Sequence, residues 1–179
     1  MNTIIGTGEA IVLPKISAQV DYEAELAVVI GRSARHVLAA QALEYVAGYT
    51  IFNDVSARDI QKRSSQWMLG KSFDTFGPLG AALVTPDEIP DPHTLELSLM
   101  HNALERQHTN TCHMIFSIPM LIACLSEAMT LEPGDVISTG TPAKINGEPG
   151  VSIFMKPGDA ITIRIEKIGE LINPVVAEI

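Results

Sequence analysis

The chain has 179 residues, of which 46% are hydrophobic, so it is long enough for one domain with a buried core. Its formal net charge is −9 at pH 7 and its pI is near 4.9, which argues against nucleic acid or an anionic membrane as partners. The only cysteines, Cys112 and Cys124, predict two reduced and packed thiols rather than a disulfide framework or a zinc site. No leader-like or long apolar run opens the chain, and we expect a cytoplasmic location.

Two acidic residues open the main predicted strand of the first third of the chain. After a turn at 6–8 and a short strand at 11–13, residues 23–30 alternate faces, which puts Glu23 and Glu25 on the same side. That side becomes apolar further along the strand, so the pair should lie at the edge of a buried region. Buried paired carboxylates repel each other and lose hydration unless a proton or a cation compensates them. A divalent metal is the simplest compensation.

A third carboxylate follows the next predicted strand. Residues 37–46 fit a short helix, and 46–52 fit a buried strand; a connection of this length permits parallel or mixed pairing with the acidic strand. If a helical turn follows, Asp54, Arg58 and Gln61 share one face. Three carboxylates without a Cys or His ligand pattern favour a hard cation, Mg²⁺, Mn²⁺ or Ca²⁺.

A second interpretation of the same spacing stays open. Glu23 and Glu25 could decorate an edge strand, where charged side chains are common. Asp54 could then be a helix cap, because Asp is a preferred N-cap residue.

Residues 61–80 show no clear period and are typical of a functional loop. Lys71 lies there among apolar side chains, so it could hold a substrate carboxylate or be an ordinary solvated charge. Trp67 is expected to pack at the edge of a pocket.

The second half of the chain predicts short strands around one clear helix. The predicted strands are 81–84, 95–100, 136–139 and 161–166. The helix spans 117–129, with Ser117 as its candidate cap. Its core-facing side chains are predicted to be Leu121, Ile122, Leu125 and Met129. Residues 133–135 and 157–159 predict two turns of the same type, each before a strand. Many short strands with two or three short helices predict an α+β fold of packed mixed sheets.

Six runs of the sequence resemble the fumarylacetoacetate hydrolase family, in the family's order and over nearly the whole chain. They are 21–31 (DYEAELAVVIG), 48–61 (GYTIFNDVSARDIQ), 70–74 (GKSFD), 77–78 (GP), 131–142 (LEPGDVISTGTP) and 156–159 (KPGD). The resemblance is to the family's C-terminal catalytic domain, as in acylpyruvate hydrolases and hydroxyheptadienedioate isomerases. It implies a layered β-roll, a single domain over 1–179, and a homodimer.

The resemblance also implies roles for individual residues. Its metal ligands match Glu23, Glu25 and Asp54, and the positions that line its substrate pocket match Arg58, Gln61, Lys71 and Thr141. Arg58 and Lys71 are also expected to act in catalysis. Together with a divalent metal, Mg²⁺ first and Mn²⁺ or Ca²⁺ as alternatives, these two cations suit a small anionic 2-oxo or 1,3-diketo acid. Carbon–carbon hydrolysis is the first expectation, and isomerisation or decarboxylation through the same enolate are alternatives.

Two departures from the family pattern stand out. Relatives typically carry Asn-Gly where this chain has Asn102-Ala103, and a side chain at positive φ costs about 1 kcal/mol relative to Gly, so another turn type is expected. Relatives that cleave carbon–carbon bonds also carry a His and a Glu on an N-terminal lid, which would lie upstream of Met1. The five histidines match no such motif and are expected in surface or loop positions: His36, His93, His101, His108 and His113. A binding subunit that has lost about 10²- to 10⁴-fold in rate is therefore the rival interpretation.

Overall fold

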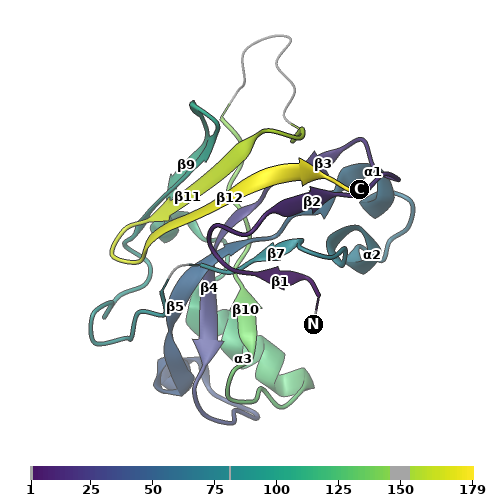
Figure 1. Cartoon of the computed structure of the whole chain (residues 1–179). Coiled ribbons are helices and arrows are strands. Elements are labelled where there is room, and N and C mark those ends of the chain that lie inside the picture. Colours follow the sequence, from purple (N-terminus) through teal and green to yellow (C-terminus); the bar gives the residue numbers. More distant parts are fainter. Residues whose placement is uncertain (1, 81, 146–153) are drawn as a thin grey trace.

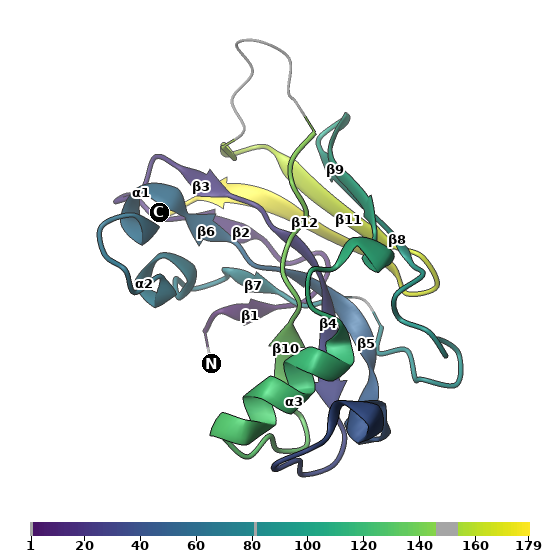
Figure 2. The same cartoon turned by 180° about the vertical axis from the view of Figure 1, so that it is seen from behind.

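The computed structural model of the chain describes residues 2–80, 82–145 and 154–179. The fold contains two main sheets, which Figures 1 and 2 show from opposite sides. The buried apolar side chains of the described residues form one cluster. The larger sheet has the strand order β2-β12-β11-β8-β9. It is a mixed sheet, because β2 and β12 are parallel whereas every other neighbouring pair in this sheet is antiparallel. Its strands are β2 (Ile11–Leu13), β12 (Gly169–Ala177), β11 (Ala160–Ile165), β8 (Glu96–His101) and β9 (Leu104–Asn110).

The smaller sheet, in the order β10-β4-β5, has the acidic strand at its centre. Its strands are β10 (Val136–Ser138), β4 (Ala24–Ile30) and β5 (Val46–Asn53). β4 and β5 are antiparallel, so the parallel or mixed pairing considered for them is wrong. The helix predicted between them is a 3₁₀ helix, η1 (Ala39–Tyr45), and Gly31 N–H donates to the carbonyl oxygen of Tyr45 at 2.7 Å. The chain therefore re-enters the sheet at the end where it left.

Short elements gather around the other end of β4. They are β1 (Ile4–Ile5) paired with β7 (Gly77–Pro78), β3 (Val20–Asp21) paired with β6 (Ser56–Ala57), α1 (Arg58–Gln61) and α2 (Met68–Lys71). The loop predicted over 61–80 thus contains a helix and a strand, each too short to give a sequence period. The α+β prediction is confirmed: the described fold is rich in strands and has few, short helices.

Among the described residues, the one α-helix longer than a single turn is α3 (Ile118–Ala128), which packs against η1. Its buried side chains are Ile118, Ile122 and Ser126, and Leu121 and Leu125 are partly buried. Met129 was placed on the core face by its spacing, but it is 52% exposed because the chain leaves helical geometry at this residue. Ser117 is the N-cap, although its hydroxyl makes no capping hydrogen bond.

The two turns predicted to be alike share their geometry. Gly134 and Gly158 both have φ of +94°, a region that glycine enters without strain. Asp135 and Asp159 each accept a hydrogen bond from the backbone N–H three residues earlier, at 2.8 and 2.7 Å. These turns lead into β10 and β11, close to the predicted strands. β12, which follows β11, was not predicted.

The β8–β9 hairpin takes the left-handed conformation at Asn102, with φ of +56°, and not at Ala103. Asparagine tolerates this region better than residues with larger apolar side chains, so no glycine is needed. The strand predicted at 81–84 is reduced to an isolated bridge between Val84 and Tyr49, and residue 81 lies outside the described part of the chain.

Both cysteines are free, but they are exposed, so the prediction that they are packed is wrong. No helix among the described residues has the length and apolar character that crossing a bilayer requires.

Candidate metal centre

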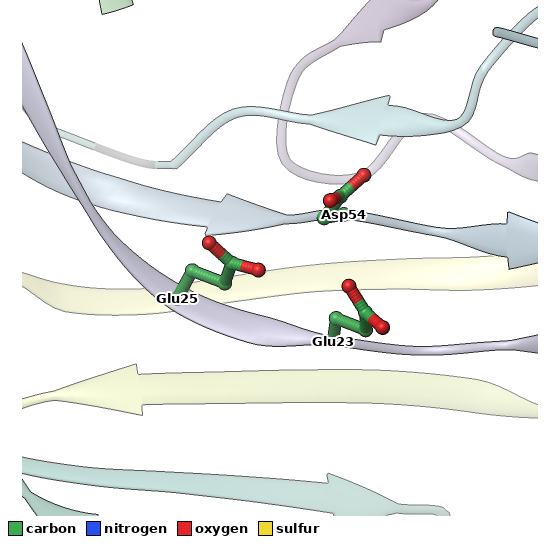
Figure 3. A group of neighbouring side chains, drawn as sticks. All are labelled: Glu23, Glu25 and Asp54. Carbon is green, nitrogen blue, oxygen red and sulfur yellow. The ribbon is translucent and has the colours of Figure 1, made fainter. Parts of the chain in front are cut away.

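The antiparallel register of β4 and β5 brings the three predicted acids together. Ala24 pairs with Asn53, and just outside the strands Asp54 N–H donates to the carbonyl oxygen of Glu23 at 2.9 Å. Glu23 and Asp54 are therefore cross-strand neighbours, and Glu25 lies two residues along on the same face as Glu23. Figure 3 shows the three side chains turned toward one another.

The cluster has the composition and dimensions of a hard-cation site. One carboxylate oxygen from each of Glu23, Glu25 and Asp54 lies within 4.8 Å of the others. Hard cations bind oxygen at about 2.0–2.6 Å, so one ion could reach all three with small side-chain movements. Glu23 and Glu25 are 8% and 3% exposed, which makes an uncompensated pair costly. The donor set therefore fits a divalent metal.

The structure does not support the edge-strand interpretation. β4 is the central strand of its sheet, with neighbours on both sides. The N-cap of α1 is Ala57, so Asp54 does not cap that helix. The predicted helical turn from Asp54 is also wrong, since the helix begins only at Arg58.

Two cations from α1 and α2 contact the acid cluster. Lys71 Nζ donates to Glu23 Oε2 at 2.8 Å and also bonds Asp54 Oδ2. Arg58 Nη2 lies 2.6 Å from Glu23 Oε1, and its Nη1 donates to Gln61 Oε1 at 3.1 Å. Arg58 and Lys71 thus contact the carboxylates, and Gln61 joins them through Arg58.

Burial and charge set the protonation of this cluster. Burial raises the pKa of Glu25 to about 7, against the lowering effect of hydrogen bonds from Ser138 and Gly140. Burial also raises the pKa of Asp54, although Lys71 opposes this rise. Burial alone would lower the pKa of Lys71, but its hydrogen bonds to Asp54 and Glu23 outweigh this and raise it. Lys71 therefore carries its proton at neutral pH.

Strand β10 and the loop after it hold Glu25 in place. Gly140 N–H donates to Glu25 Oε2 at 2.7 Å, and the Ser138 hydroxyl bonds the same oxygen. Thr141 donates to the carbonyl oxygen of Ala24 at 3.0 Å and accepts from Gln107 Nε2 at 2.8 Å. One acceptor lone pair of the Thr141 hydroxyl remains.

Sequence reasoning missed two charged members of the cluster. Asp21, 2% exposed, accepts from Arg58 Nε at 2.8 Å and also binds Lys144 Nζ. Lys144 lies 123 residues from Asp21, and Nζ stands 4.5 Å from the ring centroid of Tyr22. Burial lowers the pKa of Lys144, against the opposing effect of Asp21. Asp21 lies two residues before Glu23, so the strand period of two could have predicted that it shares the face of the acids. No pattern in the sequence around Lys144 predicts its contact with Asp21.

Gly70 sets the distance between α1 and α2. A Cβ atom built on Gly70 would lie 2.8 Å from backbone atoms of Gln61, closer than side chains pack. The absence of a side chain at Gly70 therefore lets α2 approach α1 and direct Lys71 to the acids.

Replacing Gly70 with alanine is expected to push α2 outward, displace Lys71, and lower stability by about 1–3 kcal/mol through overpacking. Thermal melting and metal titration of G70A would measure both effects. Gly6→Ala is the matched control, because its added Cβ would meet only Glu9 Oε2 at an ordinary 3.4 Å. Equal behaviour of the two variants would contradict this role of Gly70.

A separate apolar cavity of about 390 Å³ lies on the flank of the loop after β10. Its walls include Leu97, Met114, Phe116 and Leu121. It shares Gly140 and Thr141 with the surroundings of the acids, but none of the three acids, Arg58, Gln61 or Lys71 lines it. The cavity thus lies next to the candidate metal centre and is not the opening through which a ligand would reach the three acids.

The family model for the fumarylacetoacetate (FAA) hydrolase C-terminal region matches residues 1–176. The chain belongs to the fumarylacetoacetate hydrolase family. Among its curated relatives is the mitochondrial oxaloacetate tautomerase Fahd2a of Rattus norvegicus, 47% identical over 176 residues, which are 98% of this chain and 56% of the rat protein. The chain thus spans about half the length of that relative.

Solved structures support the same family fold. The 2-hydroxyhepta-2,4-diene-1,7-dioate isomerase of Mycobacterium marinum superposes with a TM-score of 0.91 at 44% identity, over 99% of this chain and 66% of the isomerase. Maleylpyruvate hydrolase of Sphingobium sp. SYK-6, solved with manganese(II) and pyruvate, superposes with a TM-score of 0.88 at 34% identity. The superposition covers 99% of this chain and 62% of the hydrolase. Similar proteins therefore include tautomerases, isomerases and hydrolases.

Proposed function

We propose that this chain forms the catalytic centre of a divalent-metal-dependent enzyme that stabilises the enolate of a small 2-oxo acid, with keto–enol tautomerisation of an oxaloacetate-like dicarboxylate as its reaction. The observation that carries this proposal is the protonated Lys71, held between Glu23 and Asp54 at the edge of a buried acid cluster. The 47% identity to an oxaloacetate tautomerase supports the choice of reaction.

Glu23, Glu25 and Asp54 would hold the metal, Mg²⁺ or Mn²⁺. The manganese in the related maleylpyruvate hydrolase supports this assignment. When bound, such a cation supplies Lewis-acid polarisation of the 2-oxo acid oxygens.

The cationic side chains keep donors for the substrate. Arg58 has five N–H groups and uses three, toward Asp21, Glu23 and Gln61. The other two N–H groups are available to a substrate carboxylate. Lys71 has three N–H groups and uses two, so the third can donate to the oxygen on which enolate charge develops. Gln61 and Thr141 would complete the polar wall, through an amide NH₂ and a hydroxyl lone pair.

Carbon–carbon hydrolysis, the first expectation from sequence, becomes the second candidate. The similarity to a maleylpyruvate hydrolase solved with pyruvate favours it. Hydrolysis also needs a base to activate water. None of the five histidines contacts the three acids within the described residues, and His101, expected at the surface, is instead buried and bonded to Asp159.

A single set of assays separates these activities. Metal-depleted protein would be given enol-oxaloacetate and acylpyruvates, with and without Mg²⁺ or Mn²⁺, and ketonisation, cleavage and carbon dioxide release would be followed. Metal-dependent ketonisation without cleavage supports tautomerisation, cleavage supports hydrolysis, and carbon dioxide release supports decarboxylation. Metal-dependent binding without any turnover would favour the binding-subunit interpretation.

We further propose that the protein is a homodimer in the cytoplasm. Ile115 is 89% exposed, and Phe116 and Met120 are about half exposed, so large apolar side chains gather beside the apolar cavity. Exposed apolar patches of this kind mark association surfaces. The cytoplasmic location remains a prediction from the sequence.

Phe116→Asp is expected to shift the protein from dimer to monomer, because the partner would have to bury a charge. Size-exclusion chromatography with light scattering would measure the masses. Met129→Asp, at the far end of α3, is the control and should leave the dimer intact. A monomeric wild-type protein would contradict the dimer proposal.

A further inference from the structure

Three buried polar atoms without hydrogen-bond partners gather in one region of the described structure. They are the Tyr22 hydroxyl, His101 Nδ1 and Arg106 Nε. The rings of Tyr22 and His101 meet edge to face, 5.5 Å between centroids. His101 and Arg106 line the same cavity of about 160 Å³. Buried polar groups are almost always satisfied, so a cluster of three calls for a bound polar species.

Arg106 is the most informative member of this group. It is 3% exposed, and no carboxylate among the described residues forms an ion pair with its guanidinium. A buried guanidinium without a counter-ion is costly. The Tyr22 hydroxyl is also buried without a partner and is a second donor in this region.

The remaining charges around the cavity do not cancel that of Arg106. Lys156 adds a second positive charge to the lining. Asp159 is the one carboxylate among the described residues that line the cavity. It already accepts hydrogen bonds from Asn102 Nδ2 at 2.9 Å and from the Lys156 backbone N–H at 2.7 Å, and it bonds His101 Nε2 at 2.7 Å. The described residues of this region thus carry a net positive charge and include donors that lack acceptors.

We propose that this cavity binds a small oxyanion of the phosphate or carboxylate class, at a site distinct from the metal centre. Its volume is several times the roughly 30 Å³ that one water occupies in the liquid. The fork of N–H groups on Arg106 matches an oxyanion, and Lys156 adds a point charge at the rim. None of Glu23, Glu25, Asp54, Arg58 or Lys71 lines the cavity.

The test uses inorganic phosphate and acetate as probes on the metal-depleted full chain, by calorimetry and thermal melting at low ionic strength. Loss of one charge-assisted contact is expected to weaken binding at least ~10-fold. Lys156→Ala should show this loss and Arg106→Gln a larger one. Tighter binding of phosphate than acetate would assign the site to phosphate, and the reverse to carboxylate.

Lys167→Ala is the matched control, because it removes one exposed lysine from the β11–β12 turn, at the opposite end of β11 from Asp159. It should bind as the wild type does. If Arg106→Gln does not fold, Lys156→Ala still decides the question because Lys156 is exposed. Absence of binding to the wild type, an equal loss in K156A and K167A, or a crystal structure in which only waters bridge Tyr22, His101 and Arg106, would overturn the proposal.

Discussion

Replacing Glu25 with glutamine is expected to weaken divalent metal binding by at least about 100-fold. Glu25 is the most buried of the three acids, and its Oε2 is held by Ser138 at the end of β10 and by Gly140 in the loop that follows. Changes to groups that only support a ligand typically cost 10–100-fold in metal affinity, and a direct ligand should cost more. Calorimetric titration of metal-depleted protein with Mn²⁺ and Mg²⁺ would measure the loss.

The same variant has a second readout in the pH dependence of stability. The pKa of Glu25 is raised by burial to about 7 in the folded chain, from the ordinary value of 4.5. The stabilisation from this proton is therefore complete below about pH 4.5 and is lost as the pH rises through about 7. Metal-free wild type should melt at a lower temperature at pH 8 than at pH 6, with a smaller difference in E25Q.

Metal should reverse this dependence, because the bound cation favours the ionised carboxylate. Mn²⁺ should then raise the melting temperature of the wild type more at pH 8 than at pH 6. Glu127→Gln on the exposed side of α3 is the matched control and should behave as the wild type in every titration. Undiminished metal affinity in E25Q would exclude Glu25 as a ligand.

The sequence predicted the meeting of the three acids because strand geometry is local. A period of two puts Glu23 and Glu25 on one face, and a buried strand ending before Asp54 places a third carboxylate at a strand end. The sequence did not fix how the two strands pair. The antiparallel register, which makes Glu23 and Asp54 cross-strand neighbours, follows from the way η1 returns the chain to the sheet.

Contacts between distant segments could not be predicted from the sequence. Lys144 reaches Asp21 across 123 positions, and Ser138 reaches Glu25 across 113, with no periodic pattern to relate them. Single-turn helices such as α2 are too short for a period, so Lys71 was placed only through the family resemblance. Met129 shows the opposite error, since its spacing fits a helix that ends one residue earlier.

Lys71→Met is expected to change metal binding and catalysis in opposite directions. In the metal-free chain the ammonium of Lys71 contacts both Glu23 and Asp54, so an incoming metal has to compete with it. Its removal should strengthen Mn²⁺ binding by roughly 10-fold and destabilise the metal-free protein by about 2–3 kcal/mol, below the range for fully buried pairs because Lys71 is partly exposed. Turnover should fall by about 10²- to 10³-fold, since one donor to the developing enolate is lost.

Lys62→Met is the matched control, because Lys62 is an exposed lysine at the C-terminal end of α1 and contacts none of the three acids in the described structure. Calorimetry, melting curves and tautomerase assays on both variants separate two roles of Lys71. If Lys71 only compensates charge in the metal-free state, its removal would strengthen metal binding and leave turnover at saturating metal unchanged. A residue that also contacts the substrate loses turnover even when the metal site is full, and this is the result that the third, free N–H group of Lys71 leads us to expect.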